Sequence, residues 1–426
     1  MKAIGIDLGT TSICGILIDT NTGVVLRSRT ENSNSFIEGA YSWERIQQPE
    51  KIISMAIEIL EDLMCEDVAA IGVTGQMHGI VYVDCRGKAV SPLYTWQDGR
   101  GNQTYKGTTY AKFLNSHSGY GLVTDFYNRE NGIVPKEAVD FCTIQDYLVM
   151  SLCGLSKPKV HISDAASFGN FDLEKGYFTI DCGIEVEKGY ALAGTYQGIP
   201  VSVAIGDNQA SVFSTLASTE SVLINIGTGS QVSIVSDEIV EAPGVETRPY
   251  FEDKFLVVGS ALCGGRAYAV LKEFYKQILS YVTDITDCQV YDIMTNMLSK
   301  TNDSLDVDTR LEGTRVNDNL RGSINGISTT NFTPETLTHG FVEGMVRELF
   351  DLYKTMNVNR NGLVGSGNGL RKNGALKKCA QRMFNAPLQI PVHREEAAYG
   401  AALFALVSAG FFKNAAEVQK MIQFEE

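Results

Sequence analysis

The chain has 426 residues, of which 44% are hydrophobic, and its formal net charge at pH 7 is −14. This length suits two domains of ordinary size. The acidic balance argues against a nucleic acid or an anionic membrane as the partner, because both require a cationic face. The nine cysteines include no C-x-x-C pair, and no stretch reaches the roughly 18 apolar residues of a membrane span. We therefore expect a cytoplasmic protein that acts on a small molecule.

The chain opens with β-rich segments and then a helix. Residues 2–19 ("KAIGIDLGTTSICGILID") and 22–30 ("TGVVLRSRT") predict an antiparallel meander with tight turns. Residues 47–64 place apolar side chains at helical spacing, and the apolar run "VAAIGVTG" at 68–75 predicts a buried strand. The predicted order is three strands, a helix and a strand.

The opening pattern has a second copy. Residues 221–237 ("SVLINIGTGSQVSIVSD") again predict strand, turn and strand, and Asp7 to Ser12 aligns with Asn225 to Ser230. Internal duplication is the economical interpretation. We therefore predict an N-terminal domain over 1–218 and a related C-terminal domain over 219–426, with a cleft between them.

Further elements follow in each half. "DNQASVFSTLAS" predicts a helix that carries the chain across from the first half to the second. Residues 333–356 predict an amphipathic helix with Thr333 as N-cap and Pro334 in its first turn. A turn ("VGSGNG") is expected at 364–369, and a helix rich in small residues at 395–410.

The two Gly-Thr turns are candidate phosphate-binding loops. Backbone amides of such turns and their hydroxyls donate to phosphate oxygens, which selects Thr10, Thr11, Gly227 and Thr228. Asp7 would repel bare phosphate but suits a hydrated Mg²⁺ that bridges phosphates. The alternative is that both segments are ordinary hairpin turns. The Walker A pattern is absent, which excludes a P-loop.

Asp207 is the candidate general base. It follows the apolar strand "IPVSVAI" and opens the helix that begins "DNQA", at a strand end where α/β proteins place their chemistry. A carboxylate there can accept the proton of a hydroxyl that attacks phosphorus. The alternative is a purely structural role as helix N-cap.

Two polar clusters near predicted strand ends suggest a site for a hydroxyl-rich ligand. "GQMHG" and "TWQDGR" supply amide, imidazole, carboxylate, guanidinium and an aromatic face, from Gln76, His78, Trp96, Asp98 and Arg100. The alternative for His78 is a structural role. The five histidines have no metal-ligand spacing, and no Ser/His/Asp or Cys/His arrangement stands out.

These motifs, in their sequence order, resemble the FGGY carbohydrate kinases across nearly the whole chain. The resemblance rests on "GIDLGTTS", "GQMHG", "TWQDGR", "SDAA", "GDNQAS", "NIGTGS" and "GSGNGLRKNGALKKCAQRMF…EEAAYGAAL". It implies an α/β, two-domain actin-like ATPase (ribonuclease H-like) fold with an interdomain cleft. It also implies transfer of phosphate from ATP, with Mg²⁺, to the terminal primary hydroxyl of a ketose. The second half resembles family members that act on a seven-carbon ketose, and those that act on xylulose are the alternative.

The resemblance also assigns roles to single residues. It makes Asp207 the catalytic base and Asp7 the magnesium-associated aspartate. The phosphate loops contain Thr10, Thr11, Gly227 and Thr228; the sugar side contains Gln76, Met77, His78, Trp96, Asp98, Arg100 and Asp207; and the adenosine side contains Gly365, Ser366, Gly367 and Asn368. The first domain would bind the sugar and the second the nucleotide.

Two other classes of protein remain as alternatives. An actin-fold nucleotide switch would keep the phosphate turns but would not need the polyol-binding clusters. A silent sugar-binding regulator would have lost Asp207 or a phosphate turn, and the chain retains both. The sequence leaves the oligomeric state open, with a homodimer as one option.

Overall fold

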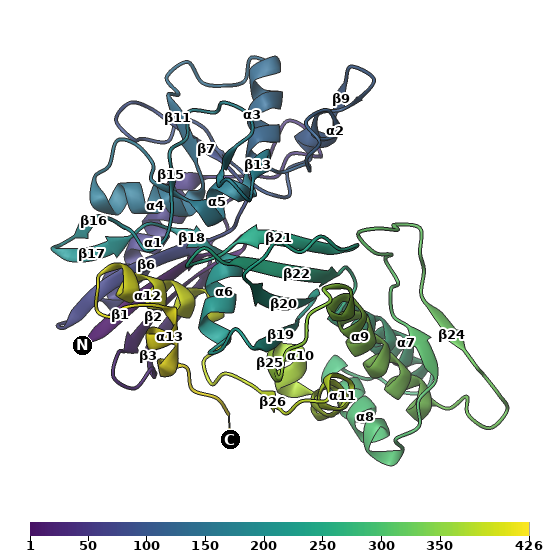
Figure 1. The fold of residues 1–426 in the computed structure, drawn as a ribbon. Coiled ribbons are helices and arrows are strands. Elements are labelled where there is room, and N and C mark those ends of the chain that lie inside the picture. Colours follow the sequence, from purple (N-terminus) through teal and green to yellow (C-terminus); the bar gives the residue numbers. More distant parts are fainter. Residues whose placement is uncertain (426) are drawn as a thin grey trace. The chain divides into compact units, whose positions relative to one another are not determined.

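The computed structural model describes residues 1–425, and Figure 1 shows the fold. The chain divides into two compact units. Unit 1 comprises Met1–Ala217, Arg248–Phe255 and His393–Gln423, and unit 2 comprises Ser218–Thr247, Leu256–Val392 and Phe424–Glu426. The first division lies beside the boundary expected at residue 218. Segments 248–255 and 393–423, which we expected in the second domain, group with unit 1.

Unit 1 is built on a mixed seven-stranded sheet. Its strand order is β16-β17-β6-β1-β2-β3, and β18 pairs with β6. β2 is antiparallel to both β1 and β3, as the predicted meander requires, and β1 is parallel to β6. The strands are β1 (Lys2–Leu8), β2 (Ser12–Asp19), β3 (Val25–Asn32), β6 (Val68–Gly75), β16 (Leu192–Tyr196), β17 (Ile199–Ser202) and β18 (Ile205–Gly206).

Three helices of unit 1 pack on this sheet or on each other. The predicted helix over 47–64 is α1 (Pro49–Leu63), which contacts β1 and β2. The helix rich in small residues is α12 (Glu396–Ser408), yellow in Figure 1, which lies against β1 and β6 and also against α6 (Asp207–Thr215). The remaining longer helices of the unit are α3 (Gly121–Glu130) and α4 (Ile144–Cys153).

Glycines allow α12 to approach the sheet and α6 this closely. A Cβ atom on Gly5 of β1 would lie 1.8 Å from the carbonyl oxygen of Ala398, and one on Gly400 would lie 1.9 Å from that of Ala210. Any side chain at either position would force the backbones apart. The close packing fixes α6, and therefore Asp207 at its first turn, relative to the ends of β1 and β6.

Unit 2 repeats the central part of this topology. Its six-stranded sheet has the order β21-β22-β20-β19-β25-β26. β19 is antiparallel to β20 and parallel to β25, just as β1 pairs with β2 and β6, which supports the predicted duplication. The strands are β19 (Ser221–Ile226), β20 (Ser230–Ser236), β21 (Val245–Pro249), β22 (Phe255–Ala261), β25 (Gly362–Ser366) and β26 (Leu388–Gln389).

The helices of unit 2 surround a core of buried aliphatic side chains from β19, β20 and β25. They are α7 (Gly265–Ser280), α8 (Asp287–Lys300), α9 (Pro334–Thr355), α10 (Gly367–Lys372) and α11 (Gly374–Phe384). Thr333 caps α9 through its side chain, and Pro334 opens the helix, as predicted. The expected turn at 364–369 is instead the junction of β25 and α10. Within residues 1–425, no helix combines the length and apolar character needed to cross a bilayer.

Candidate active site

Asp7 is a half-buried residue near the end of β1. Its Oδ1 atom has no hydrogen-bond partner among residues 1–425. Burial, followed by the charges of Asp207 and Glu395, raises the pKa of Asp7 to about 7. A carboxylate with an unused oxygen beside two other acids suits a cation that offsets their repulsion.

The protein alone does not build a complete metal site here. No group of three or more His, Cys, Asp or Glu side chains in residues 1–425 is placed to hold a metal ion. The protein therefore offers one carboxylate to Mg²⁺, and water and substrate phosphates would provide the remaining ligands. Mg²⁺ is often bound in this way. Asp7 is the residue that would associate with it.

Asp207 occupies the first position of α6. Gly206 is the N-cap residue and provides no side-chain cap, so Asp207 is not the N-cap. Burial raises the pKa of Asp207 to about 6, while the nearby charge of Arg248 and the backbone amide of Asn208 lower it. The carboxylate is thus more basic than an ordinary aspartate and still ionised at neutral pH, which suits a general base.

The loop after β1 is tied to two of the predicted sugar-side residues. The indole N–H of Trp96 donates to Thr10 Oγ1 at 3.0 Å, and Thr10 Oγ1 donates to Gln76 Oε1 at 3.4 Å. Gln76 is buried, and its amide nitrogen donates to Gln47 Oε1 at 2.9 Å. The ring of Trp96 remains 47% exposed, so its face is open to a ligand. Thr11, an exposed residue, accepts the backbone N–H of Ser33 through its carbonyl oxygen.

Met77 and His78 form a tight turn after β6. Met77 is buried and packs against Gly206, where an added Cβ would lie 2.8 Å from the sulfur atom. His78 has a left-handed backbone with φ of 73°, which is uncommon for a residue other than glycine. Its ring stacks on Tyr120 at a centroid distance of 4.3 Å. Because its Nδ1 lies 2.7 Å from the Ser167 carbonyl oxygen, which can only accept, Nδ1 carries the hydrogen.

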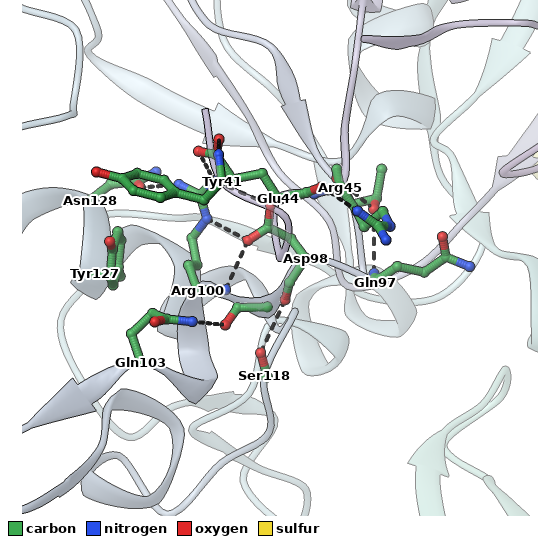
Figure 2. Close-up of polar contacts among 12 residues, drawn as sticks. Tyr41, Glu44, Arg45, Gln97, Asp98, Arg100, Gln103, Ser118, Tyr127 and Asn128 are labelled. Carbon is green, nitrogen blue, oxygen red and sulfur yellow. Dashed lines mark hydrogen bonds and ion pairs between the residues drawn. The ribbon is translucent and has the colours of Figure 1, made fainter. Parts of the chain in front are cut away.

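Asp98 and Arg100 pair with each other inside the protein (Figure 2). Both are 1% exposed, and Arg100 Nε donates to Asp98 Oδ1 at 2.6 Å. Asp98 also accepts the backbone N–H of Arg45 at 3.0 Å, and the guanidinium of Arg100 lies 4.0 Å from the ring centre of Tyr94. This burial does not support direct contact with a sugar. We propose instead that the pair holds the turn that presents Trp96.

The predicted phosphate turn of unit 2 joins β19 to β20. Gly227 N–H donates to the Gly229 carbonyl oxygen at 2.9 Å, and Thr228 and Gly229 are exposed at its tip. The start of α7 lies against this turn. A Cβ on Gly265 would lie 2.0 Å from the Gly227 carbonyl oxygen. The Arg266 N–H donates to the Thr228 carbonyl oxygen at 3.1 Å.

The predicted adenosine-side residues span the junction of β25 and α10. Gly365 and Ser366 end the strand, and Ser366 is fully buried. Its hydroxyl accepts from Asn225 Nδ2 at 2.6 Å. Gly367 has a φ of 84°, and Asn368 is exposed at the start of the helix. Gly367 and Asn368 are therefore the members of this group that a ligand can reach.

Sequence reasoning missed several residues of the site. Gln47 lies just before α1 and belongs to no recognised motif. Arg248 lies on a segment that is distant in sequence from the rest of unit 1 but belongs to that unit in the folded protein. Glu395 was visible in the quoted "EEAAYG" but received no role. The Gly264-Gly265 pair was a usable signal, because adjacent glycines before a helix often mark a close backbone approach.

The fold places the chain in a defined class of proteins. Xylulose kinase from Rhodospirillum rubrum superimposes with a TM-score of 0.84 at 18% identity, over 100% of this chain and 93% of that one. Xylulose kinase from Lactobacillus acidophilus gives a TM-score of 0.83, also at 18% identity and with the same coverage. The protein thus has the two-domain, actin-like ATPase fold.

The family follows from the sequence. The N-terminal domain of the FGGY family of carbohydrate kinases matches residues 2–182, and its C-terminal domain matches residues 222–409. The chain belongs to the FGGY family of carbohydrate kinases. It is therefore a phosphotransferase of a family that uses ATP, and the alternatives of a nucleotide switch or a silent regulator are set aside.

Curated relatives align over almost their whole length. Sedoheptulokinase of Mus musculus is 30% identical over 95% of this chain and 97% of its own, and that of Homo sapiens is 28% identical with the same coverage. Xylulose kinase of Staphylococcus xylosus is 25% identical over 98% of this chain and 93% of its own.

Proposed function

We propose that this kinase transfers the γ-phosphoryl group of ATP to the terminal primary hydroxyl of sedoheptulose, giving sedoheptulose 7-phosphate. The observation that carries the substrate assignment is the similarity to the mouse sedoheptulokinase, at 30% identity over 95% of this chain. The xylulose kinase relative is less similar, at 25% over a comparable length.

The proposed chemistry uses Asp207 as the base. Its carboxylate accepts the proton of the sugar hydroxyl while the hydroxyl oxygen forms a bond to the γ-phosphorus of ATP. The bond from that phosphorus to the β,γ-bridging oxygen breaks, and ADP leaves with the electron pair. A pKa of about 6 supports this role, because the carboxylate is ionised at neutral pH but a better proton acceptor than an unperturbed aspartate.

On the sugar side, His78 and Trp96 are the proposed contacts. The hydrogen bond from Nδ1 to the Ser167 carbonyl oxygen orients the His78 ring, and we propose that the ring contacts a sugar hydroxyl through Nε2. The half-exposed face of Trp96 suits the C–H face of a sugar. Gln76 and Met77 are buried and are proposed to shape this side rather than to touch the ligand.

On the nucleotide side, the turns that contain Thr10, Thr11, Gly227 and Thr228 are proposed to bind the phosphates. Gly367 and Asn368 are proposed to lie beside the adenosine. Mg²⁺, associated with Asp7, would neutralise charge on the phosphate oxygens. This account is supported by the repetition of one turn in two units of like topology.

Xylulose is the second candidate substrate. Both ketoses offer a terminal primary hydroxyl, so discrimination has to come from the rest of the sugar. A seven-carbon ketose has two more carbinol groups than a five-carbon one. At about 1 kcal/mol for each satisfied hydrogen bond, two contacts would separate the kcat/KM values by roughly tenfold or more.

A coupled ADP-release screen over free ketoses and polyols tests the proposal. We expect sedoheptulose to give the highest rate, and NMR of the product to show phosphate on the C7 oxygen. Phosphate on another oxygen would contradict the proposed orientation of the sugar. ADP release that does not depend on any sugar or polyol would contradict the proposed function altogether.

A further inference from the structure

A short helix of unit 1 binds both the residue before the proposed base and the proposed sugar contact His78. This helix, α5 (Ile162–Ser167), contains the "SDAA" motif, which has no role in the proposed function. The Gly206 N–H donates to Ser163 Oγ at 3.0 Å, and the His78 N–H donates to Ser167 Oγ at 3.0 Å. Both serines are buried, with exposures of 0% and 4%.

The surroundings of Ser163 orient its hydroxyl toward Gly206. His161 Nδ1 lies 2.8 Å from Ser163 Oγ and also accepts the Ser163 backbone N–H at 3.2 Å, so this ring nitrogen is an acceptor. The serine hydroxyl hydrogen therefore points to His161, which leaves an oxygen lone pair for the Gly206 N–H. Gly206 is the residue directly before Asp207, so this bond fixes the backbone from which the base projects.

Ser167 holds the strained turn at His78 by two hydrogen bonds, and a third orients its own hydroxyl. Its hydroxyl donates to the Asp164 carbonyl oxygen at 2.7 Å and accepts the His78 N–H. Its own carbonyl oxygen accepts the Nδ1 hydrogen of the His78 ring at 2.7 Å. The left-handed backbone of His78 persists only where its surroundings hold it in place, and Ser167 binds both its amide and its ring.

We propose that Ser163 and Ser167 are positioning residues of this kinase, Ser163 for the Asp207 base and Ser167 for the His78 ring. This inference rests on the proposed function, because it takes the roles of Asp207 and His78 from there. Loss of Ser163 would misplace a group that acts in the reaction, whereas loss of Ser167 would misplace a group that binds the sugar in both ground and transition states. The two serines therefore affect different kinetic constants.

Alanine variants of the two serines test this difference. We expect Ser163→Ala to lower kcat about 10- to 100-fold with little change in the KM for sugar, because small displacements of a reacting group cost rates of that order. Ser167→Ala removes the hydroxyl that accepts the His78 N–H but keeps the carbonyl oxygen that binds the ring. Because the turn that carries the ring loses one of its two bonds, we expect the KM for sugar to rise several-fold with a smaller effect on kcat. Equal effects of both variants on kcat and KM would overturn the assignment.

Ser202 of β17 offers a matched control. It is 1% exposed, and its hydroxyl has no hydrogen-bond partner within the described residues. Ser202→Ala makes the same change in a buried part of unit 1 without removing a bond, so both kinetic constants should stay at the wild-type values. Ser163→Ala with the kinetics of Ser202→Ala would overturn the positioning role.

A double variant separates this proposal from the proposed function. Once Asp207→Asn has removed the base, Ser163→Ala should lower kcat no further, because misplacing an absent base costs nothing. A multiplicative loss in the double variant would indicate general damage and overturn the proposal. If Asp207→Asn alone keeps the wild-type kcat, the base assignment of the proposed function fails first.

Hydrogen exchange gives a measurement that does not depend on turnover. In the full-length protein, the Gly206 amide should exchange faster in Ser163→Ala than in wild type, and the His78 amide faster in Ser167→Ala, each without change at the other site. Unchanged protection of both amides would overturn the proposal. A variant too unstable to purify is replaced by Ser163→Cys or Ser167→Cys, in which the weak thiol acceptor should give a smaller effect in the same direction.

Discussion

Asp7 at the end of β1 and Asp207 at the start of α6 are neighbouring carboxyl groups within unit 1. The charge of Asp207 is, after burial, the largest influence that raises the pKa of Asp7. Two like charges held together cost stability, and the proposed binding of Mg²⁺ beside the proposed base would explain why such a cost is kept. The interaction between these two carboxyl groups should therefore affect the stability of the protein, which can be measured without substrates.

Asp7→Asn should stabilise the protein in the absence of Mg²⁺ while abolishing activity. The folded-state pKa of Asp7, about 7, lies above the usual value of 3.8, so the folded protein binds a proton that the unfolded chain has released. Its contribution to the free energy of unfolding therefore falls as pH rises from about 4 to about 7. The variant should gain about 1–3 kcal/mol at pH 8 and almost nothing near pH 4. Thermal unfolding at both values checks this, and a variant less stable than wild type at pH 8 would contradict it.

Asp207→Asn should separate catalysis from binding. An amide cannot accept the hydroxyl proton, so we expect kcat to fall about 10²- to 10⁴-fold while ATP and sugar still bind nearly as in wild type. Calorimetry measures the binding and the coupled assay measures kcat. If the side chain only supported the start of α6, asparagine would serve about as well and turnover would stay near normal.

The dependence of kcat/KM on pH should report the raised pKa of Asp207. Saturating MgATP should keep Asp7 in its ionised form, so the acidic limb for the sugar should then report Asp207 alone. Because a base works only when ionised, activity should fall about tenfold for each pH unit below about 6 and stay level from there to pH 8. The Asp207→Asn variant should lack this acidic limb. A limb near pH 4 in the wild-type enzyme would show that Asp207 is an ordinary exposed carboxylate in the free protein.

Gly265→Ala should weaken nucleotide binding through the phosphate turn of unit 2. Its Cβ would lie 2.0 Å from the Gly227 carbonyl oxygen, so the turn has to shift. We expect MgATP, which should raise the melting temperature of the wild type by mass action, to raise that of the variant less. Gly374→Ala is the control, because its Cβ would meet no atom within 4 Å. Equal MgATP shifts in the three proteins would contradict the role of this turn.

Local sequence patterns predicted the elements that bear the site. The strand, turn and strand of each copy, the helix that begins at Asp207, and the capped helix after Thr333 are all formed as expected. These features depend on residues close together in the chain, such as the glycine-threonine turns and the Thr333-Pro334 start signal. The same local signals identified Asp7, Thr10 and Asp207 as residues at element ends.

Features that depend on distant segments were not predictable in the same way. Arg100 was expected on the sugar side because its polar cluster suits a hydroxyl-rich ligand, but Asp98 and the rings of Tyr94 and Trp43 surround it. Likewise α12 packs on β6 and on β1, and β1 lies almost 400 residues before α12 in the chain. Gly5 of β1 and Gly72 of β6 lie at this contact, but a glycine in a strand does not indicate its partner.

The most direct test of the central claim compares kcat/KM for sedoheptulose and for xylulose at saturating MgATP. If the kinase recognises a seven-carbon ketose through the carbinol groups that xylulose lacks, sedoheptulose should be preferred by about tenfold or more. A value for xylulose equal to or above that for sedoheptulose would contradict this assignment.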